Sequence, residues 1–502
     1  MTIKRNVLNT LSLVYIYLPI LIFLFGWCRW YVAISCAVVS VWVLCTMLHT
    51  YNDERGDLHI SRNAFIFFLI FIVVMAYYLG WGRYVEQWGG DANRNNGILN
   101  DLVYRSWPII YSDHQGGKCM LTYYLLHFIV PGFIGKLFLS YRLAELVFAL
   151  WSCIGIFLVY FQLLLGLRVK TFGKQFFVIL VLFFFMQPLV MGRPIIEYLY
   201  PDTVFYGGTG ETLWCTENLQ LPLQSNWSNL YYDFQQAIEP WLVTIIFIEN
   251  NRQVQYYVPL LLPVLMYGAF PFVALLPYAL VYVFMYLQSL QYNWKKWLSE
   301  VFSFSNISIS CTLGTVFIVY LLGNVLGDKP IEVSTRLLAW PGLYGNLILF
   351  VLLVLIPFPL LVWRENRYNP IWYITFMLLL VFPFVKVGLF NDQVKFGVVV
   401  QFYLMFMLLQ YIFEYNNKDT WKKNLKWMFT LLLLVCSFTI PFQHLLKQIK
   451  EDDIYSLAED YSCGTLENWS DRSNPAIRVD LKYNYFTYNL ESSFFYKYIA
   501  RK

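Results

Sequence analysis

The run NAFIFFLIFIVVMAYYLGWG (residues 63–82) passes directly into RYVEQWGGDANRNNGILNDLVYRSWPIIYSDHQGGKC (residues 83–119). The first run is apolar over a length that can cross a bilayer, since a spanning helix takes about 17–25 residues. The second run carries carboxylates, amides, a histidine and paired glycines. A chain that opens so long a polar segment beside a membrane span is unusual unless the segment has a task.

Composition extends this reading to the whole chain. Hydrophobic residues make up 59% of the 502 residues and charged residues 13%, against roughly 45–50% and 25% in soluble proteins. We therefore expect an all-α polytopic membrane protein with about 13 transmembrane helices. The predicted spans are 8–27, 31–49, 63–81, 143–165, 175–191, 237–249, 256–270, 272–288, 307–323, 341–363, 370–389, 397–415 and 426–442.

The basic residues predict how these spans are oriented. Lys and Arg concentrate in alternate connectors, as they do on the cytoplasmic side of membrane proteins, so they do not indicate a nucleic-acid partner. The N-terminus is then cytoplasmic and the C-terminus outside, provided that residues 120–138 form an outer-surface or re-entrant helix that does not cross. The basic connectors are those with Lys4 and Arg5; Arg55 and Arg62; Arg168, Lys170 and Lys174; Lys295 and Lys296; Arg364 and Arg367; and Lys418, Lys422, Lys423 and Lys426.

The long polar segments all fall on the outer side in this arrangement. A transmembrane domain covers residues 1–442, with outer loops 82–142 and 192–236, and residues 443–502 form an outer tail or small subdomain. This asymmetry predicts that the protein works at the non-cytoplasmic face.

Asp91 is the first candidate for chemistry. It follows two glycines shortly after a membrane exit, where partial desolvation would raise the pKa of its carboxyl and make it a better base. The competing interpretation is a helix N-cap or a solvated loop residue, since Asp is a favoured cap. Asp101, ten residues on, is expected to face solvent.

A second group of candidates lies in FPFVKVGLFNDQVKFG (residues 382–397). Lys386 and Lys395 flank the turn formed by Asn391 and Asp392, and two cations with two polar groups at one membrane surface could hold a phosphate. Arg142 is a further phosphate candidate. The competing interpretation is that these cations extend to the lipid headgroups.

Glu239 lies beside Pro240 in the apolar run that follows NLYYDFQQ, at the predicted mouth of a span. Ionisable residues within spans usually face a cavity or a partner, although a residue at a helix entry can also reach water. Glu239 and His127 complete the predicted substrate-binding set. Only five histidines occur in the chain, so no metal ligand set is predicted.

The chain resembles the GT-C superfamily of membrane glycosyltransferases. The resemblance rests on Asp91 near a membrane exit, the loop segment YYLLHFIVPGFIGKLF with Arg142 after it, and NDQVKF at a late turn. It implies a bacterial inner-membrane enzyme of cell-envelope polysaccharide biosynthesis, which transfers a sugar from a polyprenyl-phosphate donor to a glycan or lipid acceptor. Asp91 would be the base and Lys395 a phosphate contact. The family's acidic pair is a single carboxylate here, so the cofactor stays unknown and a divalent metal remains open.

Two other function classes remain open. A polysaccharide polymerase or ligase would act on lipid-linked oligosaccharides, and a transporter would carry such lipids across the membrane. Transporters often show internal repeats and broken helices around a midplane site. The break YGAFPFVALLP (residues 267–277) suits a transporter, whereas the outer clustering of polar residues favours an enzyme.

Overall fold

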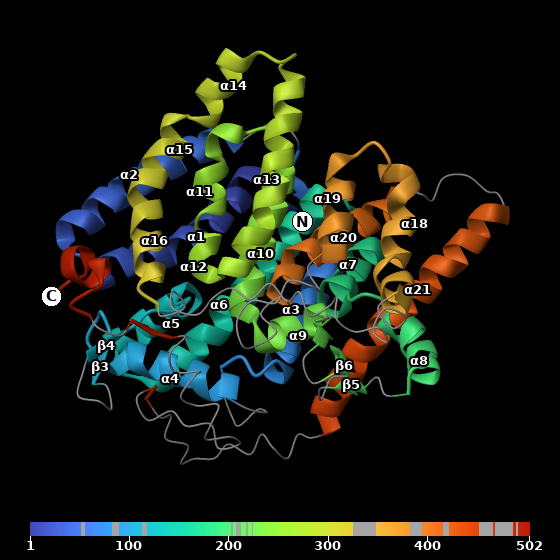
Figure 1. Cartoon of the computed structure of the whole chain (residues 1–502), viewed down its shortest axis with the longest axis horizontal. Coiled ribbons are helices and arrows are strands. Elements are labelled where there is room, and N and C mark those ends of the chain that lie inside the picture. The colour runs from blue at the N-terminus through green and yellow to red at the C-terminus, as the bar shows by residue number, and fades with distance from the viewer. Residues whose placement is uncertain are drawn as a thin grey trace.

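The structure is a computed structural model in which helices form a bundle (Figure 1). It describes residues 1–51, 56–82, 90–112, 118–201, 204–206, 212–216, 219–222, 224–324, 348–381, 394–414, 421–450, 465–466, 485–487 and 490–502, with backbone alone at 90–93, 112, 204–206, 212–216, 219–222, 394 and 421–425. The first half contains helices α1 (Arg5–Trp27), α2 (Trp30–Tyr51), α3 (Arg62–Tyr78), α4 (Gly90–Tyr104), α5 (Leu126–Leu137), α6 (Tyr141–Gly166), α7 (Phe172–Phe184), α8 (Leu189–Leu199), α9 (Asn226–Tyr232) and α10 (Phe234–Glu249).

The second half is also helical where it is described. It contains η1 (Val254–Tyr256), α11 (Tyr257–Leu261), α12 (Val264–Tyr267), α13 (Ala269–Ser289), α14 (Trp294–Val301), α15 (Phe304–Ile309), η2 (Ser310–Gly314), α16 (Thr315–Leu322), η5 (Val351–Leu355), α18 (Pro357–Asn366), α19 (Pro370–Val381), α20 (Val394–Glu414), α21 (Trp421–Lys450) and η8 (Phe495–Ile499).

The long helices are apolar on their outward faces as well as on their packed ones. Exposed apolar side chains on α2 and α3 include Val38, Trp42, Ile70 and Val73. Exposure of such apolar surfaces to water would be unfavourable, whereas lipid chains solvate them without any further packing. The described chain therefore forms an integral membrane protein, as its composition predicts.

The described residues contain eight helices long and apolar enough to cross a membrane, or nine if the pair 348–366, bent by 57°, counts as one span. These nine coincide with nine of the predicted spans. The other four predicted ranges hold shorter helices, namely α3, α10, the segment 254–267 and α19. Since α10 has 16 residues, it rises about 24 Å, less than the roughly 30 Å of a bilayer core. A count of 13 spans thus remains a prediction.

The bundle has two chemically different ends, which we name after residues of α1. At the Arg5 end, Arg5 Nη2 lies 3.1 Å from Glu249 Oε2 at the close of α10. At the Trp27 end, the backbone N–H of Arg501 donates to the Trp27 carbonyl over 2.8 Å. Lys174 donates to the Phe413 carbonyl, and the ammonium group of Lys426 lies over the Tyr411 ring. Both contacts are near the end of α20, so both lysines lie at the Arg5 end. The described basic connectors thus share one end, as the alternation of charge predicts.

Three small antiparallel sheets occur in the described residues. β1 (Thr2–Ile3) pairs with β2 (Leu58–His59), and β5 (Val204–Tyr206), β6 (Thr212–Thr216) and β7 (Leu219–Pro222) form a second sheet. The third joins β3 (Ile110–Ser112), β4 (Lys118–Leu121) and β8 (Phe486–Thr487) in that order. Figure 1 shows α4, β3 and β4 together at the edge of the molecule opposite α14. We call these three elements and β8 the polar layer. Because β8 belongs to the predicted outer tail, this part of the tail joins the same layer.

Candidate functional site at the Trp27 end

Helix α4 carries the first candidate, Asp91, in its first turn. Asp91 is therefore inside the helix and does not precede it as an N-cap. A carboxylate there interacts favourably with the positive end of the helix dipole. The side chain of Asp91 lies outside the described atoms, so the structure fixes the place of its backbone only.

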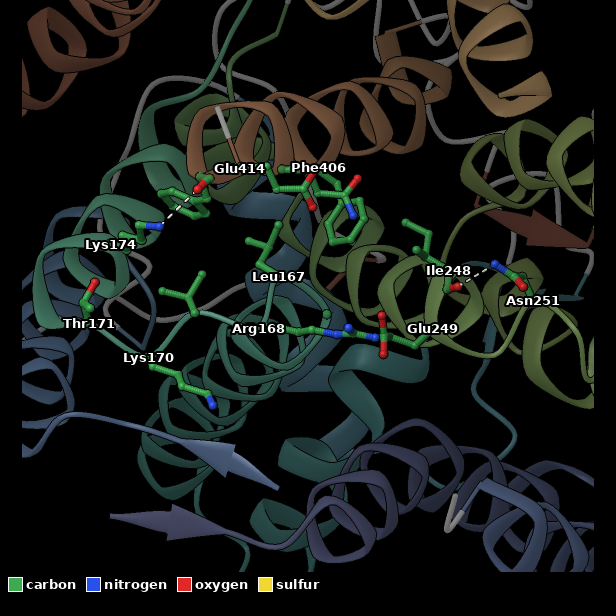
Figure 2. A pocket seen from close by; sticks show the side chains of 14 residues that line it. Leu167, Arg168, Lys170, Thr171, Lys174, Ile248, Glu249, Asn251, Phe406 and Glu414 are labelled. Carbon is green, nitrogen blue, oxygen red and sulfur yellow. Dashed lines mark hydrogen bonds between the residues drawn. The ribbon is translucent and has the colours of Figure 1, made fainter. Parts of the chain in front are cut away.

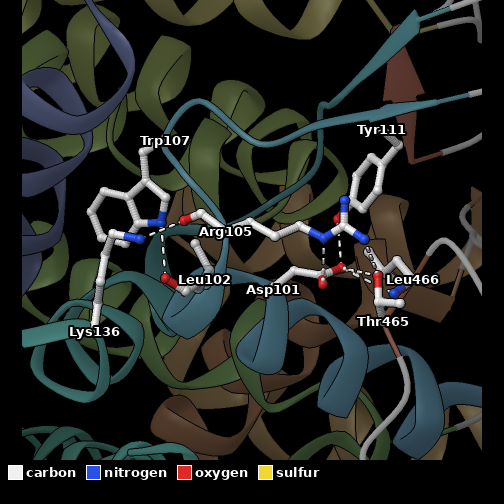
Figure 3. Close-up of polar contacts among 8 residues, drawn as sticks. All are labelled: Asp101, Leu102, Arg105, Trp107, Tyr111, Lys136, Thr465 and Leu466. Carbon is white, nitrogen blue, oxygen red and sulfur yellow. Dashed lines mark hydrogen bonds and ion pairs between the residues drawn. The ribbon is translucent and has the colours of Figure 1, made fainter. Parts of the chain in front are cut away.

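Asp101 fastens α4 to the rest of the polar layer (Figure 3). Its carboxylate accepts bonds from Tyr111 Oη (2.7 Å), Arg105 Nε (3.0 Å), Leu466 N (3.0 Å) and Thr465 Oγ1 (3.1 Å). The side chain is 2% exposed, so the expectation that Asp101 faces solvent is wrong. Burial raises the pKa of this carboxyl above its usual range, while these four donors act in the opposite direction.

The opposite face of α4 packs against α5. A Cβ added to Gly132 would lie 2.6 Å from the Leu102 Cβ, so only glycine permits this approach of the two helices. Lys136 near the end of α5 donates to the Arg105 carbonyl, and its ammonium group stands 5.6 Å from the centre of the Trp107 ring. These contacts hold α4 in a fixed position beneath the bundle.

The exit of α3 is anchored beside α9. The indole N–H of Trp81 donates to the Leu230 carbonyl over 3.2 Å. Gly82 follows with a φ of +80°, and a Cβ at this position would lie 2.8 Å from the Glu145 carbonyl oxygen. The chain that leads to Asp91 therefore starts at the turn between α9 and α10.

That turn brings Asp233 to Lys395. Asp233 Oδ1 lies 3.7 Å from Lys395 Nζ, and Gln224 Nε2 donates to Asp233 Oδ2 over 3.3 Å. The two charged side chains remain 15% and 21% exposed. The sequence predicts Lys395 as a site residue but not Asp233. Nothing in the polar run before α10 indicates that its aspartate contacts a lysine more than 150 residues away. The other three residues of the predicted phosphate group, Lys386, Asn391 and Asp392, lie outside the described residues.

Glu239 and His127 form a second, fully buried constellation. His127 Nδ1 lies 2.6 Å from Glu239 Oε1, and His127 Nε2 lies 2.9 Å from Ser152 Oγ on α6. Tyr15 on α1 lies within hydrogen-bond distance of the same Glu239 oxygen, at 3.3 Å. Both members of the pair have no exposed side-chain surface. The prediction that Glu239 sits at the mouth of a span, within reach of water, is therefore wrong.

The depth of this constellation follows from the helix rise. At about 1.5 Å per residue, Tyr15 lies roughly 15 Å along α1 from Arg5, and Glu239 lies roughly 15 Å along α10 from Glu249. Since Arg5 and Glu249 pair at one end of the bundle, the two estimates agree. His127, at the start of α5, thus lies near half depth.

This depth decides between the two forms predicted for residues 120–138. Helix α5 has 12 residues, about 18 Å, and its residues from Leu126 to Gly132 are buried. It starts beside Tyr15 and Glu239 and ends next to the start of α6, where a Cβ at Gly135 would contact Ala144. The burial of α5 inside the bundle favours the re-entrant form of this prediction over a helix on the outer surface.

Several buried polar atoms around the start of α10 have no hydrogen-bond partner among the described atoms. Both amide atoms of Gln235 and of Gln236 are in this state, as is Glu239 Oε2. Buried polar groups almost always have a hydrogen-bond partner, since a buried donor or acceptor without one costs about 1–3 kcal/mol. The start of α10 therefore has capacity for ordered water or for polar groups of a ligand.

Two predicted features stand apart from this site. Arg142 is exposed in the first turn of α6, whereas Ser152, which contacts His127, is buried about 15 Å further along that helix. Among the described residues no group of three or more His, Cys, Asp or Glu side chains could hold a metal ion.

No known protein family, no curated protein and no solved structure matches this chain. Its function has to be argued from the geometry at the Trp27 end.

Proposed function

We propose that the protein is a GT-C-like membrane glycosyltransferase that moves a sugar from a polyprenyl-phosphate-linked donor to a glycan or lipid acceptor. The observation that carries this proposal is the 3.2 Å hydrogen bond from Trp81 to the Leu230 carbonyl. It anchors the exit of α3 beside the turn at which Asp233 meets Lys395. We infer that Asp91, which follows this exit in the sequence, and Lys395 supply a carboxylate and a cation to one site at the Trp27 end.

Each group has a chemical task in such a transfer. The acceptor hydroxyl oxygen attacks the anomeric carbon, the bond from that carbon to the phosphate oxygen breaks, and its electron pair leaves with the polyprenyl phosphate. Asp91 takes the hydroxyl proton as general base. Lys395 stabilises the negative charge that grows on the leaving phosphate.

The Asp233–Lys395 pair suits a phosphate site that must be ready before the donor arrives. At 3.7 Å and partly exposed, the pair is held loosely enough for the ammonium group to exchange its partner. Lysine acts on phosphate as a mobile point charge. Asp233 keeps the cation neutralised at the membrane boundary while the site is empty.

The short α10 supports the same proposal. Because α10 rises only about 24 Å, Asp233 lies below the outer edge of a bilayer core measured from Glu249. A polyprenyl phosphate has its phosphate at the headgroup boundary and its chain in lipid, so it would reach Asp233 and Lys395 from the side of the bundle. The unpartnered amides of Gln235 and Gln236 are donors and acceptors suited to sugar hydroxyl groups.

The test separates donor binding from transfer. Undecaprenyl phosphate, the part shared by all such donors, is titrated into the purified full chain and its binding is followed by thermal unfolding. We expect Lys395→Gln to weaken binding and Asp91→Asn to leave it intact. In membranes supplied with labelled undecaprenyl-phosphate hexoses, Asp91→Asn should lower release of undecaprenyl phosphate about 10²–10⁴-fold.

A double variant distinguishes a phosphate contact from a structural ion pair. If Lys395 only neutralises Asp233, then Asp233→Asn together with Lys395→Gln restores both stability and turnover. If Lys395 contacts the phosphate, the double variant regains stability but still binds the lipid poorly. Lys118→Gln, at an exposed position of β4, is the matched control. Movement of intact donor across vesicles without sugar release would instead identify a transporter, and growth of a lipid-linked oligosaccharide would identify a polymerase.

A further inference from the structure

A cavity of about 620 Å³ opens at the Arg5 end, far along the helices from the site above. It lies between the ends of α6, α10 and α20 and the start of α7 (Figure 2). Its charged lining residues are Arg168, Lys170, Lys174, Glu249 and Glu414. Because α6, α10 and α20 all end here, the cavity lies where the helices of the bundle meet the headgroup layer.

Positively charged side chains outnumber negatively charged ones around the cavity. Glu249 is already paired with Arg5 over 3.1 Å. Counting that arginine, four cations (Arg5, Arg168, Lys170 and Lys174) face two carboxylates (Glu249 and Glu414). The surplus of two positive charges attracts an anion, and it is more than enough to neutralise the single negative charge of a phospholipid phosphodiester.

The cations differ in how firmly they are held. Lys174 donates to the Phe413 carbonyl over 3.1 Å, whereas Arg168 and Lys170 are exposed. Arg168 also has a φ of +53°, a left-handed conformation that is uncommon for a residue other than glycine. The loop therefore presents two accessible cations from a fixed and unusual backbone.

Two further features fit a phosphate that belongs to a lipid. Helix α7 begins at the cavity, and its N-cap residue Thr171 makes no side-chain capping bond, so the first-turn N–H groups keep their attraction for an anion. The apolar residues Leu167, Phe406 and Phe413 also line the cavity and could contact the first part of an acyl chain.

We propose that this cavity binds the phosphate group of an anionic phospholipid from the leaflet at the Arg5 end. The proposal is independent of the proposed transferase function. It differs from the ordinary role of basic residues as orientation signals in one respect: it requires the residues of this cavity and not merely positive charge at the same end.

The experiment compares two variants with the same change in charge. Phosphatidylglycerol is titrated into the purified full chain in a neutral detergent, and bound lipid is counted by native mass spectrometry. Arg168→Gln with Lys170→Gln should weaken retention about 30-fold, the effect of two basic residues at an anionic surface. Lys295→Gln with Lys296→Gln, on α14 at the same end, should retain the lipid like the parent. Detergent solution removes any effect of altered membrane orientation.

Two results would overturn the proposed lipid site. Equal weakening in both double variants would show diffuse attraction and overturn the site, as would unchanged retention in the cavity variant. Inorganic phosphate and phosphatidylcholine are measured beside phosphatidylglycerol. If inorganic phosphate alone matches the thermal stabilisation by phosphatidylglycerol, the assignment to a lipid fails. The single variants Arg168→Gln and Lys170→Gln, each checked for its unfolding temperature, keep the test valid if the double variant folds poorly.

Discussion

Gly155 of α6 faces the hydroxyl group of Tyr15 on α1, and there is no space for another atom between them. A Cβ on this glycine would overlap the hydroxyl oxygen and lie 2.5 Å from the Ile238 Cγ2 of α10. Three helices therefore meet at Gly155, one turn of α6 from Ser152 and the buried His127–Glu239 pair. The geometry of that pair depends on this contact.

Replacing Gly155 by alanine should accordingly be costly. We expect Gly155→Ala to lower the free energy of unfolding by about 1–3 kcal/mol, because the added methyl group overpacks the junction. Denaturant unfolding in detergent measures the change. Gly173→Ala is the control, since a Cβ there would meet nothing within 4 Å. Equal stability of the two variants would contradict the close approach.

The buried pair itself makes a second prediction. His127→Ala leaves the Glu239 carboxylate without its 2.6 Å partner in a fully buried place, and loss of one member of such a pair typically costs about 3–5 kcal/mol. Glu239→Gln keeps an acceptor oxygen and should cost about 1–3 kcal/mol. Unfolding of both variants, with the double variant, gives the coupling energy. A parent-like unfolding midpoint for His127→Ala would mean that the pair does not hold α5 to α10.

The bonds to Asp101 predict how α4 is held. Asp101→Ala removes four acceptor contacts and leaves Arg105 and Tyr111 without their carboxylate, so α4 should exchange its amide hydrogens faster together with residues 465–466. Tyr111→Phe removes one bond and should raise exchange less. Hydrogen exchange followed by mass spectrometry reports both segments. Faster exchange in α4 without any change at 465–466 would argue against the carboxylate as the link.

The orientation of the bundle gives a fourth prediction. The backbone bond from Arg501 to Trp27 places residue 502 at the end opposite Arg5. In a cysteine-free background, Lys502→Cys should react with a membrane-impermeant maleimide in intact cells, because the basic connectors favour the cytoplasm. Lys295→Cys should react only after permeabilisation. The reverse pattern would move the candidate site to the cytoplasmic face.

The membrane class and nine of the spans could be predicted because they follow from local composition. An apolar run of sufficient length needs no knowledge of its neighbours, since lipid accepts any apolar face. The shorter helices were harder to assign. Helix α5 is apolar like a span, but its first turn is positioned by Glu239 and Ser152 from two other helices.

The site could be predicted only in part, because its contacts join distant residues. Lys395 was identified from its place at a turn, yet its partner Asp233 comes from the preceding half of the bundle. The burial of Asp101 depends on Thr465, which is 364 residues away in the sequence. No spacing rule encodes such a pairing, so a loop aspartate and a buried anchor look alike in the sequence.

The β3–β4–β8 sheet has a consequence for the order of assembly. β8 lies after α21, the last membrane helix among the described residues, and pairs with β4 through Met120 and Leu121. During synthesis the β3–β4 hairpin is therefore made long before its third strand, and the edge of β4 that pairs with β8 stays open until residues 486–487 have been made. The sheet is complete only in a chain whose two distant parts have come together.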